Sequence, residues 1–196
     1  DTTAAGDIWD NGFTHGAAIG YTAMGGSDAN NNKSINYTLP TLMDDLSVAV
    51  SYSGQTTATN STTAFGVTYT GVEGLSVSYG VGEAGSTTAT AAADVTTMKA
   101  SYAIGSFTAA VSNTENDRGS TGTDEEMSSW KLSYTVSDDL SVSYGEAETE
   151  FLKPSATNVT EDVEGIAIAY TMGSMKIAGN RNEGVNMAGT AGANDE

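Results

Sequence analysis

The sequence contains no cysteine, only two prolines and few charged residues. The lack of cysteine excludes a disulfide framework and any metal site built on thiolates. Charged residues make up 16% of the 196 residues, against roughly 25% in ordinary soluble domains. No apolar run approaches the ~18 residues of a membrane-spanning helix, which excludes a helical membrane protein. Basic residues are scarce too, and the resulting net charge of -18 is the wrong sign for binding nucleic-acid phosphates.

What the sequence does contain is a long series of alternating apolar and polar residues. Ten such stretches follow one another from about residue 33 to about residue 186. Alternation predicts β-strands, because successive side chains of a strand point to opposite faces. The joints between the stretches are short and long in turn, which predicts an all-β fold of antiparallel up-and-down strands, with tight turns at one end and long loops at the other.

Charge is almost absent from the bodies of these strands. One face of each strand is apolar, and the other is small and hydroxylated, as at Ser76, Ser78 and Ser101. Only three charged side chains lie within the strand bodies, all on the hydroxylated face: Lys99, Lys131 and Lys176. A soluble sandwich would scatter charge over its outward faces. The pattern therefore favours a closed transmembrane barrel, with its apolar face in lipid and its hydroxylated face around a wet lumen. A soluble or surface-attached β-rich protein, such as an adhesin, S-layer or lectin-like protein, is the alternative.

A tyrosine returns about every 33 residues, always on the apolar face and just ahead of a short turn. These residues are Tyr37, Tyr69, Tyr102, Tyr134 and Tyr170. An amphipathic ring at a fixed level predicts an interfacial girdle, in which the hydroxyl stays wet and the ring body lies in lipid. In a soluble sheet the same tyrosines would be core residues.

Two neighbouring stretches carry a resemblance to a known family. Residues 32–40 read Asn-Lys-Ser-Ile-Asn-Tyr-Thr-Leu-Pro, and residues 46–52 read Leu-Ser-Val-Ala-Val-Ser-Tyr. Together they resemble the Gram-negative outer-membrane general porin family, in the form of its alphaproteobacterial-type trimeric porins. The resemblance implies an outer-membrane homotrimer of 16-stranded barrels. Residues 1–32 would be the constriction (third) loop segment, and residues 33–196 the barrel strands with short periplasmic turns and long extracellular loops.

The chain departs from that family at both ends. Family members begin with about five further strands and close on a terminal strand that ends in Phe, whereas this sequence ends Ala193-Asn194-Asp195-Glu196. The ten strands would match about the sixth to the fifteenth of the family. We therefore expect an internal fragment of a longer polypeptide.

The function that the resemblance implies is passive diffusion of small hydrophilic solutes and ions, with no enzymatic reaction. An inward-folded loop would carry acids, and basic residues on the barrel wall would oppose them. The candidates for this constriction are Asp7 and Asp10 on the loop and Lys99, Lys131 and Lys176 on the wall, with Lys33 and Arg181 as weaker choices. The plainer interpretation is an exposed loop and solvated lysines in a wide lumen. Acidic loops would give a mild preference for cations, against the pull of the lysines.

No catalytic site or cofactor is expected from the remaining residues. His15 is the only histidine, which leaves little material for a zinc site or a histidine-dependent triad. The hydropathy pattern places two acidic stretches in the long loops, Asp124-Glu125-Glu126 and Glu161-Asp162, and these loops are candidates for binding Ca2+ that bridges surface lipids. Solubility alone is the other explanation for these stretches.

Overall fold

The structure, a computed structural model, describes residues 34–40, 43–53, 62–84, 93–118, 123–153 and 156–194. The predicted constriction segment, residues 1–32, and with it Asp7 and Asp10, lies outside the described residues, as does Lys33. In the part of the chain that is described, no helix is both long and apolar enough to cross a membrane.

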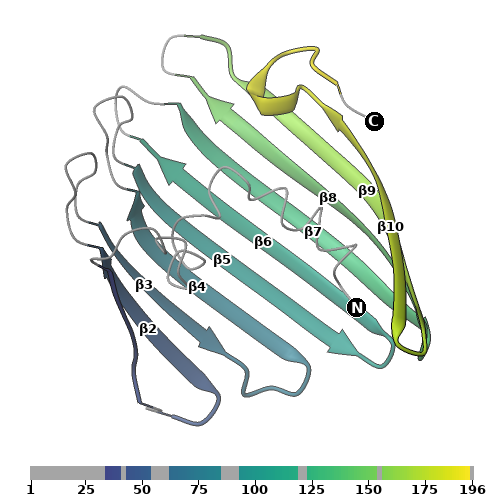
Figure 1. The fold of residues 1–196 in the computed structure, drawn as a ribbon. Helices are drawn as coiled ribbons and strands as arrows, with labels where there is room; N and C mark the ends of the chain where they lie inside the picture. Colours follow the sequence, from purple (N-terminus) through teal and green to yellow (C-terminus); the bar gives the residue numbers. More distant parts are fainter. Residues whose placement is uncertain are drawn as a thin grey trace.

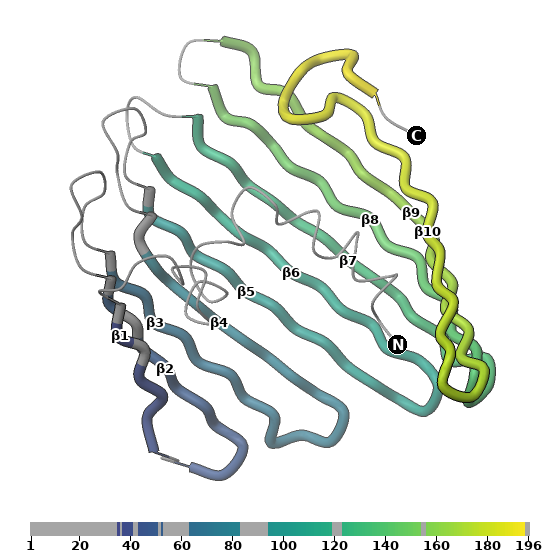
Figure 2. Tube along the Cα trace, in the orientation of Figure 1, coloured from purple at the N-terminus to yellow at the C-terminus, as the bar shows by residue number. Residues whose placement is uncertain are grey.

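Ten strands form one antiparallel sheet in which each strand pairs with the next along the chain (Figure 1). They are β1 (Ser34–Thr38), β2 (Leu46–Ser53), β3 (Thr62–Tyr69), β4 (Leu75–Ala84), β5 (Ala93–Ile104), β6 (Phe107–Asp117), β7 (Asp124–Ser137), β8 (Leu140–Leu152), β9 (Val159–Met172) and β10 (Met175–Val185), followed by a short 3-10 helix, η3 (Met187–Gly189). The predicted all-β, up-and-down order is confirmed. Among the described residues the sheet is not closed, and β1 and β10 are its two edges. Figure 2 shows the same trace curving from one edge to the other.

The short turns all lie at one end of the sheet, and four of the five contain a residue with a left-handed backbone. Gly74, Gly105 and Gly173 have φ values of 76°, 57° and 61°, a region that costs other residues a steric penalty. Asp45 takes a φ of 62° in the first turn, where aspartate is among the better tolerated alternatives to glycine. Three of the joints, between β5 and β6, β7 and β8, and β9 and β10, are only two residues long, which keeps these strands paired as antiparallel hairpins.

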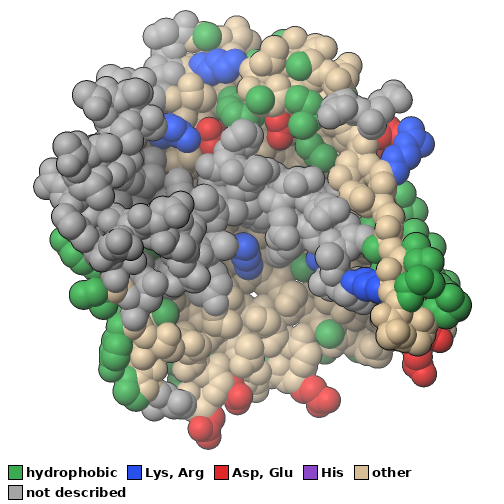
Figure 3. Space-filling view, in the orientation of Figure 1, with side chains coloured by type: hydrophobic (Ala, Val, Ile, Leu, Met, Phe, Trp, Pro, Cys, Tyr) green, Lys and Arg blue, Asp and Glu red, His purple; other side chains and the backbone are tan. Residues whose placement is uncertain are grey.

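The two faces of the sheet differ sharply. Every large hydrophobic side chain that the described strands expose lies on one face, here called the outer face, and examples are Ile35 (68% exposed), Ile166 (57%) and Leu132 (45%). Every buried side chain of the described strands lies on the other, inner face, and ten of these are polar or charged. Figure 3 shows hydrophobic side chains along the margins of the molecule and acidic ones along its lower edge.

The apolar face therefore has no partner layer among the described residues, which form a single sheet. A two-sheet sandwich would have buried these side chains in a core. The structure favours the barrel prediction over the soluble sandwich.

The strands reach further toward the long-loop end than the alternation of hydropathy indicated. Asp124-Glu125-Glu126 lies in β7 and Glu161-Asp162 lies in β9, so placing them in loops was wrong. Backbone pairing continues through both stretches, for example between Glu126 and Glu150. Hydropathy misses this because acids and threonines replace apolar residues there while the strand geometry persists.

Candidate functional site

The inner face is lined by hydroxyl groups that bond to one another across neighbouring strands. The hydroxyls of Thr68 and Ser78 lie 3.0 Å apart, and those of Ser112 and Ser129 lie 2.9 Å apart. Thr97 and Thr114 form a third pair at 3.0 Å. Such cross-strand pairs stabilise a sheet modestly and fix its register. They also make the wall polar without adding charge, as the sequence pattern predicted.

Two of the predicted wall lysines meet in one recess of the inner face. Lys99 of β5 and Lys131 of β7 both line a hollow of about 290 Å³. Lys131 is only 7% exposed, and Lys99 is half-buried. Among the described residues that line the hollow, which include Ser76, Ser78, Ser101 and Thr108, none carries a carboxylate. A pair of ammonium groups framed by hydroxyls is a favourable setting for negative charge.

Lys176 lies on the same face but not in this recess. It follows the short turn at the start of β10, opposite Thr171 of β9, and is exposed. None of the three lysines is free, since each makes an interaction within the chain. The structure thus brings together Lys99 and Lys131 and leaves Lys176 apart.

Arg181, a weaker candidate for the wall, is on the wrong face. It pairs with Ile166 in register, and its guanidinium Nη2 lies 2.7 Å from Glu183 Oε1 on the outer face. The assignment of Arg181 to the channel wall fails because every second residue of a strand lies on the same face. Arg181 therefore lies on the outer face with Ile177.

The five tyrosines of the predicted girdle lie where the pattern placed them. Each is exposed on the outer face at the short-turn end of its strand, with exposed fractions from 37% to 54%. The ring of Tyr134 stacks on Phe107 with centroids 4.6 Å apart. Their role at a membrane interface stays a prediction.

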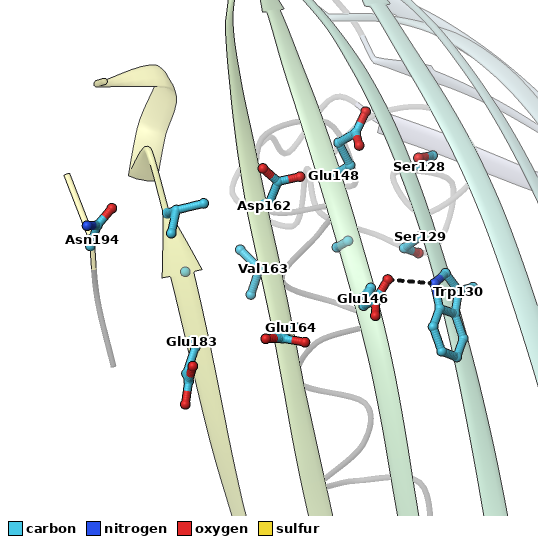
Figure 4. A pocket seen from close by; sticks show the side chains of 13 residues that line it. Ser128, Ser129, Trp130, Glu146, Glu148, Asp162, Val163, Glu164, Glu183 and Asn194 are labelled. Atoms are coloured by element: carbon cyan, nitrogen blue, oxygen red, sulfur yellow. Dashed lines mark hydrogen bonds between the residues drawn. The ribbon is translucent and has the colours of Figure 1, made fainter. Parts of the chain in front are cut away.

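An acidic cleft on the outer face was not predicted. It has a volume of about 450 Å³, and Figure 4 shows its carboxylates on three neighbouring strands, β8, β9 and β10. These carboxylates belong to Glu146, Glu148, Asp162, Glu164 and Glu183. The sequence showed that Glu146 and Glu148 share one parity, but only the register brings Glu164 and Glu183 beside them.

Aromatic donors border this cleft. The indole Nε1 of Trp130 donates to Glu146 Oε2 at 3.1 Å, and the Tyr144 hydroxyl lies 2.8 Å from Glu146 Oε1. The same hydroxyl also contacts Glu164, so its single proton lies between two carboxylates. Trp130 and Tyr144 are themselves in contact, with ring centroids 5.5 Å apart. The cluster is the point where the apolar outer face gives way to an acidic one.

No metal centre is evident in the described ranges, which hold no group of three or more acidic, histidine or cysteine side chains arranged to bind an ion. Glu125 and Glu161 point to the inner face, while Glu126 and Asp162 point to the outer face. Ca2+ binding by these stretches stays a prediction.

Comparison with known proteins points to one family. The family model described as "Gram-negative porin" matches residues 1–193. No curated protein matches the chain. Among solved structures, an anion-selective porin from Comamonas acidovorans is similar with a TM-score of 0.69 and 20% identity, over 89% of this chain and 54% of that one.

Two structures of OmpT, an outer membrane protein of Vibrio cholerae, are also similar. The in-vitro folded protein gives a TM-score of 0.62 at 17% identity, over 83% of this chain and 58% of that one. Its loop L8 deletion mutant gives 0.60 at 20% identity, over 77% and 56%. Such low identities establish a shared fold and nothing finer. The chain spans just over half the length of these proteins.

Proposed function

This chain belongs to the Gram-negative porin family, and on that premise we propose that it forms part of the wall of a water-filled channel for passive diffusion of small hydrophilic solutes and ions. Family membership places it in the bacterial outer membrane. A channel of this kind performs no chemical reaction. Its work is done by the shape and the charge of the passage.

The observation that carries the proposal is the opposite chemistry of the two faces. The outer face exposes a continuous apolar patch that includes Ile166 (57% exposed) and Ile168 (51%), which water would not favour. The inner face carries hydroxyls and lysines, which lipid would not tolerate. A sheet with this division fits between hydrocarbon and a wet passage.

Closure of the barrel requires more strands than those described. Lipid tolerates no open sheet edge, because unpaired backbone groups cannot be satisfied there. A pore of porin width needs roughly 16 strands. We propose that β1 and β10 pair with further strands of the complete protein, and that three such barrels assemble into a trimer, as the resemblance implies.

The recess of Lys99 and Lys131 is the proposed basic side of the constriction. Asp7 and Asp10 would be its acidic side, on the loop formed by residues 1–32. Opposed charges across a narrow wet gap orient water and dipolar solutes and slow apolar ones. The overall charge of -18 would enrich cations at the entrances and give the channel a mild preference for cations. The lysines of the recess would act in the opposite direction and limit that preference.

The test is reconstitution of the native protein, purified from outer membranes, into planar lipid bilayers. We expect stepwise conductance increases that scale with salt, and swelling of proteoliposomes in small sugars but not in large dextrans. On gels, the folded protein should shift in mobility only after boiling. A protein that stays dispersed without detergent, shows no such shift and leaves bilayers sealed would exclude a channel.

A further inference from the structure

The chain does not leave the sheet at the end of β10 but folds back over its rim. Residues 186–194, here called the mouth segment, follow Val185 at the long-loop end, where β8 ends and β9 begins. The segment closes on itself, because Met187 N donates to Ala193 O at 2.8 Å and Gly192 N donates to Asn186 Oδ1 at 2.9 Å. It is a compact loop rather than an extended tail.

Four of these residues have a left-handed backbone. Gly189 and Gly192 do so without cost, at φ of 65° and 79°, but Asn186 and Ala188 do so at 55° and 53°. For alanine this conformation costs roughly 1–2 kcal/mol. Such strain persists only where the surroundings fix the backbone, so something must hold the segment in place.

Three hydrogen bonds to β9 and to Lys153, the residue after β8, hold the segment in place. Ala188 N donates to the carboxylate of Glu161, Lys153 Nζ donates to Gly189 O at 2.8 Å, and the side chain of Asn186 donates to Thr160 O at 2.9 Å. A hydrogen bond to a charged acceptor is roughly twice as strong as a neutral one. Glu161 is 6% exposed, so its carboxylate is surrounded mainly by protein groups rather than by water.

Gly189 also packs directly on an aromatic ring. A Cβ at this position would lie 2.7 Å from Phe151 Cγ, and Phe151 is 6% exposed. Phe151 and Glu161 share the inner face with Lys131, as the register through β7, β8 and β9 shows. Residues 186–189 of the mouth segment therefore lie against the inner wall, while Asn194 at its far end borders the acidic cleft of the outer face.

From these contacts we propose that the mouth segment is a fixed ledge that narrows the long-loop entrance of the channel and covers the Glu161 carboxylate. The segment itself contains no charged side chain. It thus covers one negative side chain of the wall, Glu161, with a neutral surface, which lowers the preference for cations at that entrance. This inference rests on the proposed channel function.

The test is to dislodge the ledge with Gly189→Ala in the native pore. The added methyl group collides with Phe151, so the Ala188 amide should lose its bond to Glu161 and exchange its hydrogen roughly ten- to a hundredfold faster. Channel conductance should rise, and the reversal potential in a salt gradient should shift toward cation selectivity. Adding Glu161→Gln to Gly189→Ala should remove that shift in selectivity.

Gly173→Ala is the matched control. Gly173 has a similar φ of 61°, in a short turn at the opposite end, and its Cβ would meet nothing within 4 Å. It should leave the Ala188 exchange rate, the conductance and the selectivity unchanged. If Gly189→Ala does not fold, Lys153→Met removes one anchor without a collision, and faster exchange with higher conductance is again expected.

The outcomes separate the two proposals. Faster exchange at Ala188 with unchanged conductance and selectivity would overturn the ledge while leaving the channel intact. Unchanged exchange in both Gly189→Ala and Lys153→Met would also overturn it. A wild-type protein that forms no channel would instead refute the proposed function.

Discussion

The indole N–H of Trp130 donates a hydrogen bond of 3.1 Å to Glu146 across the β7–β8 pair on the outer face. Two residues nearer the short turns, the facing pair is Leu132 and Tyr144, and two residues nearer the long loops it is Ser128 and Glu148. The row of Trp130 therefore separates an apolar region from an acidic one. Aromatic side chains with a polar atom favour such boundaries between hydrocarbon and water.

We accordingly predict that Trp130 lies at the level of the lipid headgroups. In a Trp9→Phe background, which removes the other tryptophan of the chain, quenchers placed near the headgroups should reduce Trp130 fluorescence more than quenchers deep in the acyl chains. Moving the tryptophan to position 132 (Leu132→Trp with Trp130→Phe) should shift the strongest quenching by roughly 5 Å toward the bilayer centre, since barrel strands are tilted from the membrane normal. Deep quenching of Trp130 itself would contradict this placement.

The second prediction concerns charge on the two faces. Ile168 is 51% exposed on the outer face of β9, and a lysine there should destabilise the folded protein by about 2–4 kcal/mol if the site lies near the bilayer midplane. Ala178→Lys is the matched control, since Ala178 is exposed on the inner face of β10, opposite Ala169. It should cost less than about 1 kcal/mol, as lumen positions tolerate charge.

Folding into lipid vesicles at graded denaturant concentrations measures both free energies of unfolding. Equal costs at the two positions, or a larger cost at Ala178, would mean that the apolar face is not in contact with hydrocarbon.

Much of this fold follows from the order of residues along the strands. The face of Ile168, the face of Lys131 and the level of Tyr170 each depend on the two-residue period of a single strand, and all three were predicted. The mouth segment could not be predicted in this way. Its position depends on Phe151 and Glu161, which lie more than 25 residues away in the sequence, and no local pattern records such contacts.

The acidic cleft shows a second limit of sequence reasoning. Glu146 and Glu164 become neighbours only through the register of β8 and β9, which loop lengths and hydropathy do not determine at the long-loop end. The recess is similar, because Lys99 and Lys131 come from strands that are separated by β6. Parity predicted their common face, and the structure adds that they are close together.

A third prediction distinguishes two turn glycines with similar backbones. Gly105→Ala should cost only the left-handed penalty of roughly 1–2 kcal/mol, because a Cβ there would meet nothing within 4 Å. At Gly74 the same Cβ would lie 2.2 Å from the backbone oxygen of Ala103. Gly74→Ala should therefore destabilise the protein more, because a backbone atom cannot move aside as a flexible side chain can.

Chemical denaturation of the detergent-folded protein, followed by the change in gel mobility on unfolding, compares the two variants directly. A Gly105→Ala variant as unstable as Gly74→Ala would show that the close approach of Gly74 to the backbone oxygen of Ala103 has no influence on stability.

The last prediction tests the recess as the basic side of the passage. Lys99→Gln and Lys131→Gln each remove one positive charge from the same hollow while keeping a polar side chain of moderate length. Because opposite charge raises the local concentration of permeant ions, each change should shift the reversal potential in a salt gradient toward cation selectivity, and the double variant should shift it further.

Lys176→Gln is the matched control: it removes the same charge from the same face outside the recess, so its effect should be smaller. The difference should shrink as salt rises from 0.1 M to 1 M, since the screening length falls from about 10 Å to about 3 Å. Equal shifts for all three lysines at every salt concentration would mean that only the total charge of the lumen matters and that the recess has no special role.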